Sequence, residues 1–343
     1  MTNQISVPRA HRLKNKNGLE MTVTNFGGRV ITLKVPDKKG KLDDIVLGHD
    51  SPEDYLHGHP HFGALIGRYA NRISKGAFFI DGRRYQLPLN HGDNHLHGGQ
   101  GFQNRFWKMT PSSVRGDEAL LLEYSSPDGE DGYPSNVDVK VTYILTENNE
   151  WVIEYSATTD GPTVINLTQH NFYNLAGEGN GDILEHSLMI NADRITVVDR
   201  DLIPDGKMKN VQDTPFDFRR LVQVGERIND GDEQLSYGKG YDHNWVLNKL
   251  NNELSHAATL IDPVSARKME IWTTQPGLQL YTGNFLDGTD KGKAGKTYPY
   301  RSALCLEAQH FPDSPNHPQF PSTLLRPGET YFQKTVHKFT VVN

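Results

Sequence analysis

One stretch of the chain combines a carboxylate with a strand that ends abruptly, which suits acid–base chemistry. Residues 303–309 contain no Gly, Pro or Asn and predict a strand, whereas residues 310–318 contain three prolines and cannot continue a ladder. Side chains alternate along a strand, so Leu304, Leu306 and Ala308 share an apolar face, and Cys305, Glu307 and Gln309 share the other. Partial desolvation at the strand end would raise the pKa of Glu307 toward that of a general base. A solvated Glu on an edge strand is the alternative.

Five more stretches place polar side chains where a ligand could reach them. Residues 163–170 alternate so that His170 lies opposite the apolar Ile165 and Leu167. Residues 240–247 and 277–284 repeat that design, and residues 63–73 and 94–99 combine Gly with Arg, Asn and His. We therefore expect a polar cleft, which suits a polyhydroxylated ligand because its groups hydrogen-bond hydroxyls. The side chains expected in it are Arg72, His97, His170, Asp242, Gln279 and Glu307.

The elements that must position these groups are mostly strands. Residues 137–145 and 151–157 alternate apolar and polar side chains, and turn dipeptides such as Asp81-Gly82 and Asp205-Gly206 separate the extended runs. Helical periodicity is scarce: residues 51–55 predict one short helix and residues 219–228 could hold another. No βαβ rhythm is present, so we expect an all-β fold, a large antiparallel β-sandwich, with residues 1–343 as a single domain.

Composition excludes several classes of function. The net charge is −6 and no Lys/Arg-rich run occurs, which argues against nucleic acid or anionic membrane as a partner. No run of about 18 apolar residues predicts a membrane span, and residues 1–12 lack the apolar segment of a signal peptide. Cys305 is the one cysteine, so no internal disulfide forms, and a cytoplasmic location is expected. Cys305 itself is expected to be structural.

Taken together, these motifs resemble the aldose 1-epimerases, also called galactose mutarotases. The resemblance runs in order along nearly the whole chain, from Asn25-Phe26-Gly27-Gly28 to Leu325-Arg326-Pro327-Gly328-Glu329. Its other main pieces are residues 67–73, 94–99, 166–175, 240–243, 279–284 and 306–318. One departure is visible at residues 169–173, where Gln precedes His170 and the order Phe172-Tyr173 replaces Tyr-Phe. This departure bears on substrate preference rather than on the chemistry, because His170 itself is kept.

The resemblance implies a β-sandwich enzyme that interconverts the α and β anomers of free aldoses such as glucose and galactose. It implies no cofactor and no metal, and we expect a monomer or a homodimer. What resembles the catalytic base is Glu307, the acid resembles His170, and His97 matches a second active-site histidine. Asn71, Arg72, Asp242 and Gln279 match the residues that bind sugar hydroxyls. Ring opening by this pair requires a charged base and a protonated acid, so the base should have the lower pKa.

Three alternatives stay open at this point. A hexose-6-phosphate 1-epimerase would need an additional basic clamp for the phosphate, and no obvious one is present. A lectin-like β-sandwich would bind sugar without turnover, which the pairing of Glu307 with His170 argues against. A cupin-like metal site would use the histidines at 57–61 or 95–97, but neither cluster is followed by the Glu that such a site needs.

Overall fold

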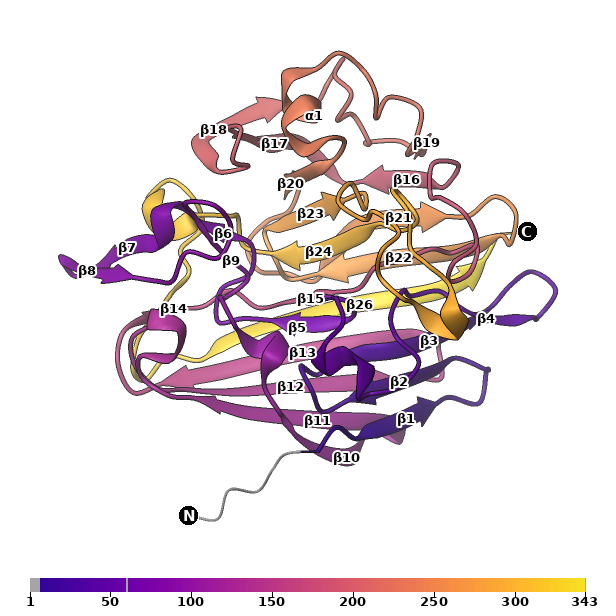
Figure 1. Cartoon of the computed structure of the whole chain (residues 1–343), viewed down its shortest axis with the longest axis horizontal. Coiled ribbons are helices and arrows are strands. Elements are labelled where there is room, and N and C mark those ends of the chain that lie inside the picture. The colour runs from indigo at the N-terminus through magenta and orange to yellow at the C-terminus, as the bar shows by residue number, and fades with distance from the viewer. Residues whose placement is uncertain (1–6, 60, 343) are drawn as a thin grey trace.

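The computed structural model describes residues 7–59 and 61–342. Its largest sheet has nine strands in the order β10-β11-β12-β13-β26-β22-β21-β16-β19, and all neighbouring pairs are antiparallel (Figure 1). The strands are β10 (Lys108–Val114), β11 (Asp117–Ser126), β12 (Val137–Leu145), β13 (Glu150–Thr159), β16 (Ser187–Ile190), β19 (Val222–Gln223), β21 (Ser255–Ile261), β22 (Arg267–Thr273) and β26 (Tyr331–Val341). The alternation predicted for residues 137–145 and 151–157 therefore corresponds to two neighbouring strands of this sheet.

A five-stranded antiparallel sheet occupies the upper part of Figure 1 and has the order β18-β17-β20-β23-β24. Its strands are β17 (Ala192–Val198), β18 (Pro204–Asn210), β20 (Asp242–Leu247), β23 (Gly277–Tyr281) and β24 (Cys305–Gln309). The N-terminal part forms a third sheet from β1 (Ala10–Lys14), β2 (Glu20–Thr24), β3 (Val30–Pro36) and β4 (Leu42–Asp44).

Short strand pairs and turns complete the structure. The pairs are β5 (Ala64–Ile66) with β15 (Thr168–His170), β6 (Arg72–Ile73) with β9 (His95–Leu96), β7 (Ala77–Ile80) with β8 (Arg83–Gln86), and β14 (Thr163–Val164) with β25 (Leu324–Leu325). The 3₁₀ turns are η1 (Asp54–Leu56), η2 (Ser74–Gly76), η3 (Phe102–Asn104), η4 (Glu130–Gly132), η5 (Lys293–Gly295) and η6 (Ser314–Asn316).

One large apolar cluster joins the three larger sheets. Leu33 of β3, Val141 of β12 and Leu280 of β23 all belong to it and are almost fully buried. Leu304, Leu306 and Ala308 lie in the same cluster, as the alternation in residues 303–309 predicts. The inner faces of the sheets thus pack on one another as in a β-sandwich, which confirms the predicted fold class.

The helix predictions were only partly right. Residues 51–55 contribute the single 3₁₀ turn η1, but residues 219–228 form no helix, because Val222 and Gln223 pair with β16 instead. The one α-helix of the described residues is α1 (Glu233–Gly238). Asp232 caps it by accepting a hydrogen bond from the backbone N–H of Gln234.

Over residues 7–59 and 61–342, no helix has both the length and the apolar character needed to cross a bilayer.

Candidate active site

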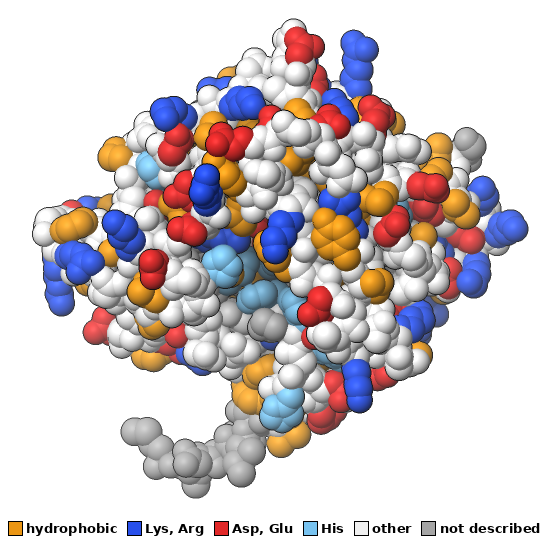
Figure 2. Space-filling model, turned by 45° about the horizontal axis from the view of Figure 1, so that its top comes forward, with side chains coloured by type: hydrophobic (Ala, Val, Ile, Leu, Met, Phe, Trp, Pro, Cys, Tyr) orange, Lys and Arg blue, Asp and Glu red, His pale blue; other side chains and the backbone are white. Residues whose placement is uncertain are grey.

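A hollow on one face of the molecule gathers several histidine side chains (Figure 2). It is a cavity of about 190 Å³ at the edge of β20, β23 and β24. The residues that line it are His59, His61, Asn71, Arg72, His91, Leu96, His97, His170, Phe172, Asp242, Tyr281, Phe285 and Glu307. Most are polar or aromatic, the types that hydrogen-bond sugar hydroxyls and pack on sugar C–H faces.

Strand register brings the acidic groups of this cavity together. In the five-stranded sheet Gln279 of β23 lies directly opposite Glu307 of β24, and Asp242 of β20 lies opposite Tyr281. Glu307 is only 2% exposed, so its carboxylate is more deeply buried than the sequence led us to expect. Its face of β24 is covered by the elements around the cavity instead of being open to water.

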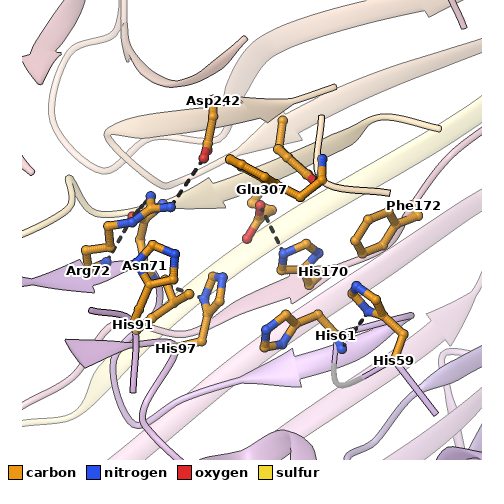
Figure 3. A pocket seen from close by; sticks show the side chains of 13 residues that line it. His59, His61, Asn71, Arg72, His91, His97, His170, Phe172, Asp242 and Glu307 are labelled. Atoms are coloured by element: carbon orange, nitrogen blue, oxygen red, sulfur yellow. Dashed lines mark hydrogen bonds and ion pairs between the residues drawn. The ribbon is translucent and has the colours of Figure 1, made fainter. Parts of the chain in front are cut away.

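β15 places His170 against Glu307. The Thr168 hydroxyl donates a hydrogen bond to the backbone carbonyl of Ala308, at 2.8 Å, and so ties β15 to β24. His170 follows two residues later on the same face. Its Nε2 lies 3.6 Å from Oε1 of Glu307, which is too long for a hydrogen bond but brings the two groups close together (Figure 3).

A backbone clip holds His97 and Asn71 in the cavity wall next to His170. Both residues have positive φ, 51° and 64°, a conformation that Asn and His adopt more readily than most side chains. The His97 backbone N–H donates to the Asn71 carbonyl at 3.0 Å, and the Asn71 N–H donates to Nδ1 of His97 at 3.1 Å. Gly98 follows at φ +76°, where an added Cβ would lie 2.0 Å from the Gly67 carbonyl oxygen. This contact explains why Gly must follow the histidine.

Arg72, Asp242 and Gln279 form a buried polar chain. Nη2 of Arg72 lies 3.3 Å from Oδ2 of Asp242, and both side chains are less than a tenth exposed. Nε2 of Gln279 donates to the other carboxylate oxygen of Asp242 at 2.6 Å. Gln279 is not among the described residues that line the cavity, so its predicted contact with a sugar stays a prediction.

Burial dominates the pKa values in the cavity. Desolvation, with a smaller contribution from the charge of Asp242, raises the pKa of Glu307 well above its usual value, although Arg72 opposes this. Desolvation, with a smaller contribution from His59, lowers the pKa of His170 to about 3. The expected order, with the base below the acid, is therefore reversed in this structure. Because an isolated charge is costly in this pocket, each group on its own favours its neutral form.

His97, His170 and Glu307 also form the one cluster of described residues with the composition of a metal site. One ligand atom from each lies within 4.8 Å of the others. Burial keeps His97 neutral by lowering its pKa well below the usual value. Its Nδ1 accepts from Asn71, so the ring proton lies on Nε2. A metal-bound imidazole instead donates from its second nitrogen, so the clip orients His97 as a hydrogen-bond donor rather than as a ligand.

The structure brings together six of the seven residues predicted from the sequence, namely Asn71, Arg72, His97, His170, Asp242 and Glu307. Sequence reasoning missed His59, His61, His91 and Phe285 as lining residues. The histidine-rich run at 57–61 is the available signal, but on its own it suggests a metal cluster and not the lining of a sugar site. These residues reach the cavity because of the way the loops pack. The alternation of apolar and polar side chains does not predict loop packing.

An antiparallel β-sandwich with a buried carboxyl–imidazole pair in a polar cavity is an arrangement that can perform acid–base chemistry on a small polar ligand. The family model for aldose 1-epimerase matches residues 9–338, and the chain belongs to this family. It is 45% identical over 324 residues to galactose mutarotase of Rattus norvegicus, covering 94% of this chain and 92% of the relative. It is 37% identical over 330 residues to aldose 1-epimerase of Escherichia coli, covering 95% and 94%.

A solved structure agrees with these relatives. An aldose epimerase homologue from C. elegans superimposes with a TM-score of 0.90 at 33% identity, covering 98% of this chain and all of the other. The chain is therefore an isomerase that interconverts sugar anomers, as the resemblance implied.

Proposed function

We propose that the protein interconverts the α and β anomers of free aldohexoses, including galactose and glucose, with Glu307 as base and His170 as acid. The observation that carries these roles is the buried pair itself, with His170 Nε2 and Glu307 Oε1 3.6 Å apart in the cavity wall. The names of the relatives, galactose mutarotase and aldose 1-epimerase, support the substrate class.

The reaction needs two proton transfers and no other reagent. Glu307 takes the proton of the C1 hydroxyl while His170 gives a proton to the ring oxygen. The bond between C1 and the ring oxygen breaks and C1 becomes an aldehyde carbon. Rotation about the C1–C2 bond exposes the other face of the aldehyde, and closure reverses both transfers. Each positioned transfer contributes roughly 10²–10⁴-fold to the rate.

The protonation state of the pair follows from the pKa directions. We infer that the active enzyme carries one proton on the pair, and that burial places this proton on Glu307 for most of the time. The reactive arrangement moves it to His170, leaving a carboxylate and an imidazolium that stabilise one another at short range. The two groups then titrate as a coupled pair, and the pH dependence of the wild-type rate describes the pair rather than either residue.

The remaining site residues are proposed to bind hydroxyls. Asn71, Arg72, Asp242 and His97 line the cavity, and His97 presents its Nε2–H as a donor. Gln279 is proposed to contribute through Asp242, to which its amide donates. Arg72 is the one Lys or Arg among the described lining residues, and Asp242 already partners it, which favours a free sugar over a phosphate ester.

Three wider points belong to the same proposal. The site draws on residues from Asn71 to Glu307, so we propose that residues 1–343 work as one catalytic domain. The single buried cysteine fits the proposed cytoplasmic location. A monomer and a homodimer are the two assembly states proposed, and light scattering of the purified protein distinguishes them.

The decisive test of the base is Glu307→Gln. The amide is close to isosteric and still hydrogen-bonds the C1 hydroxyl, but it cannot accept the proton. We expect kcat to fall by roughly 10²–10⁴-fold with galactose binding largely kept. Polarimetry of freshly dissolved α-galactose measures kcat, and calorimetry measures binding.

Glu154→Gln makes the same chemical change on a side chain that pairs with Lys334 away from the cavity, and serves as the control. Activity of Glu307→Gln within about threefold of the control would remove Glu307 from the role of base.

A further inference from the structure

Two aromatic rings lie nearly parallel to the imidazole of His170. The Phe172 ring is 4.9 Å away between centroids with an interplanar angle of 17°, and the His61 ring is 5.4 Å away at 18°. Figure 3 shows these two rings on different sides of His170. Both distances fall in the range of offset stacking, so each ring restrains the plane of the imidazole.

His170 lacks the usual means of orientation. A catalytic or metal-bound histidine is normally aligned by a hydrogen bond to its second ring nitrogen. Here Nδ1 of His170 is buried and forms no hydrogen bond with another described residue. Packing against the ring therefore helps to fix the direction of Nε2 toward Glu307.

The loop that carries His61 is itself tied to His170. The backbone N–H of Gly63 donates to the His170 carbonyl at 3.1 Å. Gly63 has φ +64°, and a Cβ there would lie 2.3 Å from the Val30 carbonyl oxygen, so the tight approach requires Gly. The loop thus holds a fixed position relative to the backbone of β15.

The His61 ring is held from a second direction. The backbone N–H of His61 donates to Nδ1 of His59 at 3.2 Å. The His59 ring in turn stacks on the Phe62 ring, with centroids 4.2 Å apart. The His61 ring also meets the edge of His97, with centroids 4.8 Å apart. His61 therefore contacts both His97 and His170 while lining the cavity.

We propose that His61 is a positioning residue for the acid, whose ring stacks on His170 and takes the place of the missing hydrogen bond to Nδ1. This proposal rests on the proposed role of His170. The stacking needs a flat ring, and the ring nitrogens of His61 are not required. A phenylalanine should therefore replace His61, and an aliphatic side chain of similar volume should not.

The test compares His61→Phe with His61→Leu. A stacked ring pair contributes about 0.5–1.5 kcal/mol, which corresponds to up to roughly tenfold in rate, and misplacement of a catalytic group costs more. We expect His61→Leu to lower kcat on galactose by roughly tenfold or more with KM nearly unchanged, and His61→Phe to retain kcat within about threefold.

The control is His57→Leu, an exposed histidine of the same loop that does not line the cavity. Circular dichroism checks the fold of every variant, and His61→Met repeats the test without a ring if the leucine variant does not fold.

A second measurement separates this proposal from the role of His170. In a His170→Asn background, His61→Leu should change the residual rate by less than about threefold, because the ring acts through the imidazole. An equal loss in both backgrounds overturns the proposal, as does unchanged kcat in His61→Leu or equal damage in His61→Phe. Full activity of the single variant His170→Asn would overturn the proposed role of His170 as acid. That result does not depend on any change at His61.

Discussion

At the scale of single residues, Glu307 and His170 are pushed by burial in opposite directions. The pKa of the carboxyl rises and that of the imidazole falls, so each group favours its neutral form. A reactive ion pair formed from them is a minor state, and its population depends on the one proton that the two groups share. Single variants allow the two groups to be studied one at a time, because each variant leaves only one of them to titrate.

The residual activities of Glu307→Gln and His170→Asn should therefore depend on pH with opposite signs. In Glu307→Gln the active form is the imidazolium, and the pKa of His170 is lowered to about 3, so activity should decline as pH rises from that value. In His170→Asn the active form is the carboxylate, and the raised pKa of Glu307 means that activity should increase with pH. Polarimetric kcat/KM, corrected for the spontaneous rate, measures both slopes. Slopes of the reverse signs would exchange the acid and the base.

Arg72 and Asp242 form a buried ion pair in the proposed sugar-binding wall. We expect Arg72→Ala and Asp242→Ala each to raise KM by roughly 10–100-fold, because a hydrogen bond to a charged group contributes about 1.5–3 kcal/mol. The double variant should lose less than the product, since each single change also leaves its partner buried and unpaired.

Saturation curves on galactose measure these KM values. Arg326→Ala, which breaks the surface pair with Asp81, is the matched control and should leave KM unchanged. An unchanged KM in both cavity variants would place neither residue on the sugar.

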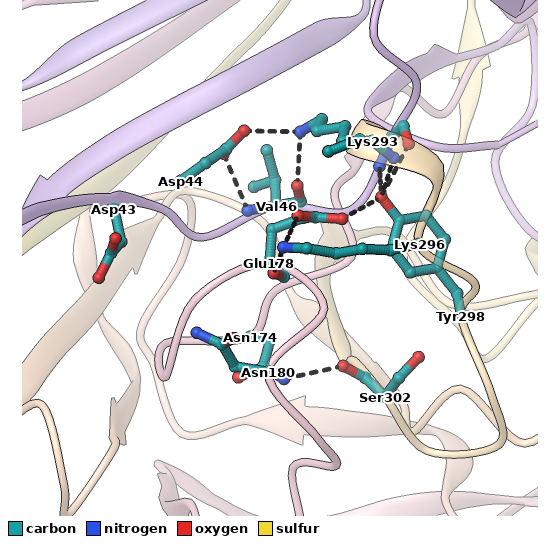
Figure 4. A network of polar contacts seen from close by, with 12 residues as sticks. Asp43, Asp44, Val46, Asn174, Glu178, Asn180, Lys293, Lys296, Tyr298 and Ser302 are labelled. Carbon is teal, nitrogen blue, oxygen red and sulfur yellow. Dashed lines mark hydrogen bonds and ion pairs between the residues drawn. The ribbon is translucent and has the colours of Figure 1, made fainter. Parts of the chain in front are cut away.

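At the scale of elements, a polar network joins three loops of the sandwich (Figure 4). The Tyr298 hydroxyl accepts from the backbone N–H groups of Gly48 and Lys293, at 3.2 and 3.1 Å, and lies within hydrogen-bond distance of Glu178. Lys296 pairs with the same Glu178 at 2.8 Å, and Lys293 pairs with Asp44 at 2.7 Å. These contacts connect β4 with the loops around residues 174–180 and 291–298.

Removing the hydroxyl in Tyr298→Phe should destabilise the protein by about 1–3 kcal/mol, because buried donors and a carboxylate lose their partner. None of the network residues lines the cavity, so kcat should change little. Urea unfolding measures the stability. Tyr300→Phe removes an exposed hydroxyl bonded to the Lys239 carbonyl and should have almost no effect. A stability equal to that of Tyr300→Phe would show that the network contributes nothing.

The sequence predicts strands correctly where the alternation of apolar and polar side chains alone determines the structure. β12 and β24 and their apolar faces follow directly from period-two patterns, and the paired strands then bring Glu307, Asp242 and Gln279 together. The alternation predicts one strand over residues 163–170, but the ladder is interrupted between β14 and β15, where Asn166 bonds the backbone of Arg68 and Ala70. The position of His61 depends on a loop, and loop geometry follows from tertiary contacts that a local pattern does not contain.

At the scale of the whole molecule, the site is assembled from segments that are far apart in the chain. β6 brings Arg72, His97 directly follows β9, β15 brings His170, and β20 and β24 bring Asp242 and Glu307. The same close packing buries histidines throughout the structure, well away from the cavity as well as inside it. These buried imidazoles couple the stability of the entire sandwich to pH.

Four histidines illustrate this coupling, since burial lowers the pKa values of His170 and His337 to about 3 and those of His186 and His243 to about 4. Above pH about 6.5 these rings are neutral in both states, so their contribution to stability is fully present. Below that pH the unfolded chain binds protons that the folded protein refuses, so this stability is lost as pH falls toward the folded pKa values. Each ring contributes up to about 1.4 kcal/mol per pH unit.

Glu307 acts in the opposite direction, because its raised pKa lets the folded protein keep a proton that the unfolded chain releases. One such group does not offset four histidines. We therefore expect the free energy of unfolding to fall between pH 6.5 and 4. Urea unfolding at a series of pH values measures this slope. A stability that holds steady or rises over this range contradicts the argument.

His337→Phe tests a single contribution to that slope. His337 stacks on Trp151 at 5.0 Å between centroids, and its buried Nδ1 has no hydrogen-bond partner among the described residues, so a phenylalanine keeps the packing and removes only the titration. The slope should become shallower by about one proton, or about 1.4 kcal/mol per pH unit. The exposed His57, changed in the same way, should leave the slope as it is. An unchanged slope in His337→Phe would mean that this ring is protonated in the folded protein, and that burial at the centre of β26 does not keep it neutral.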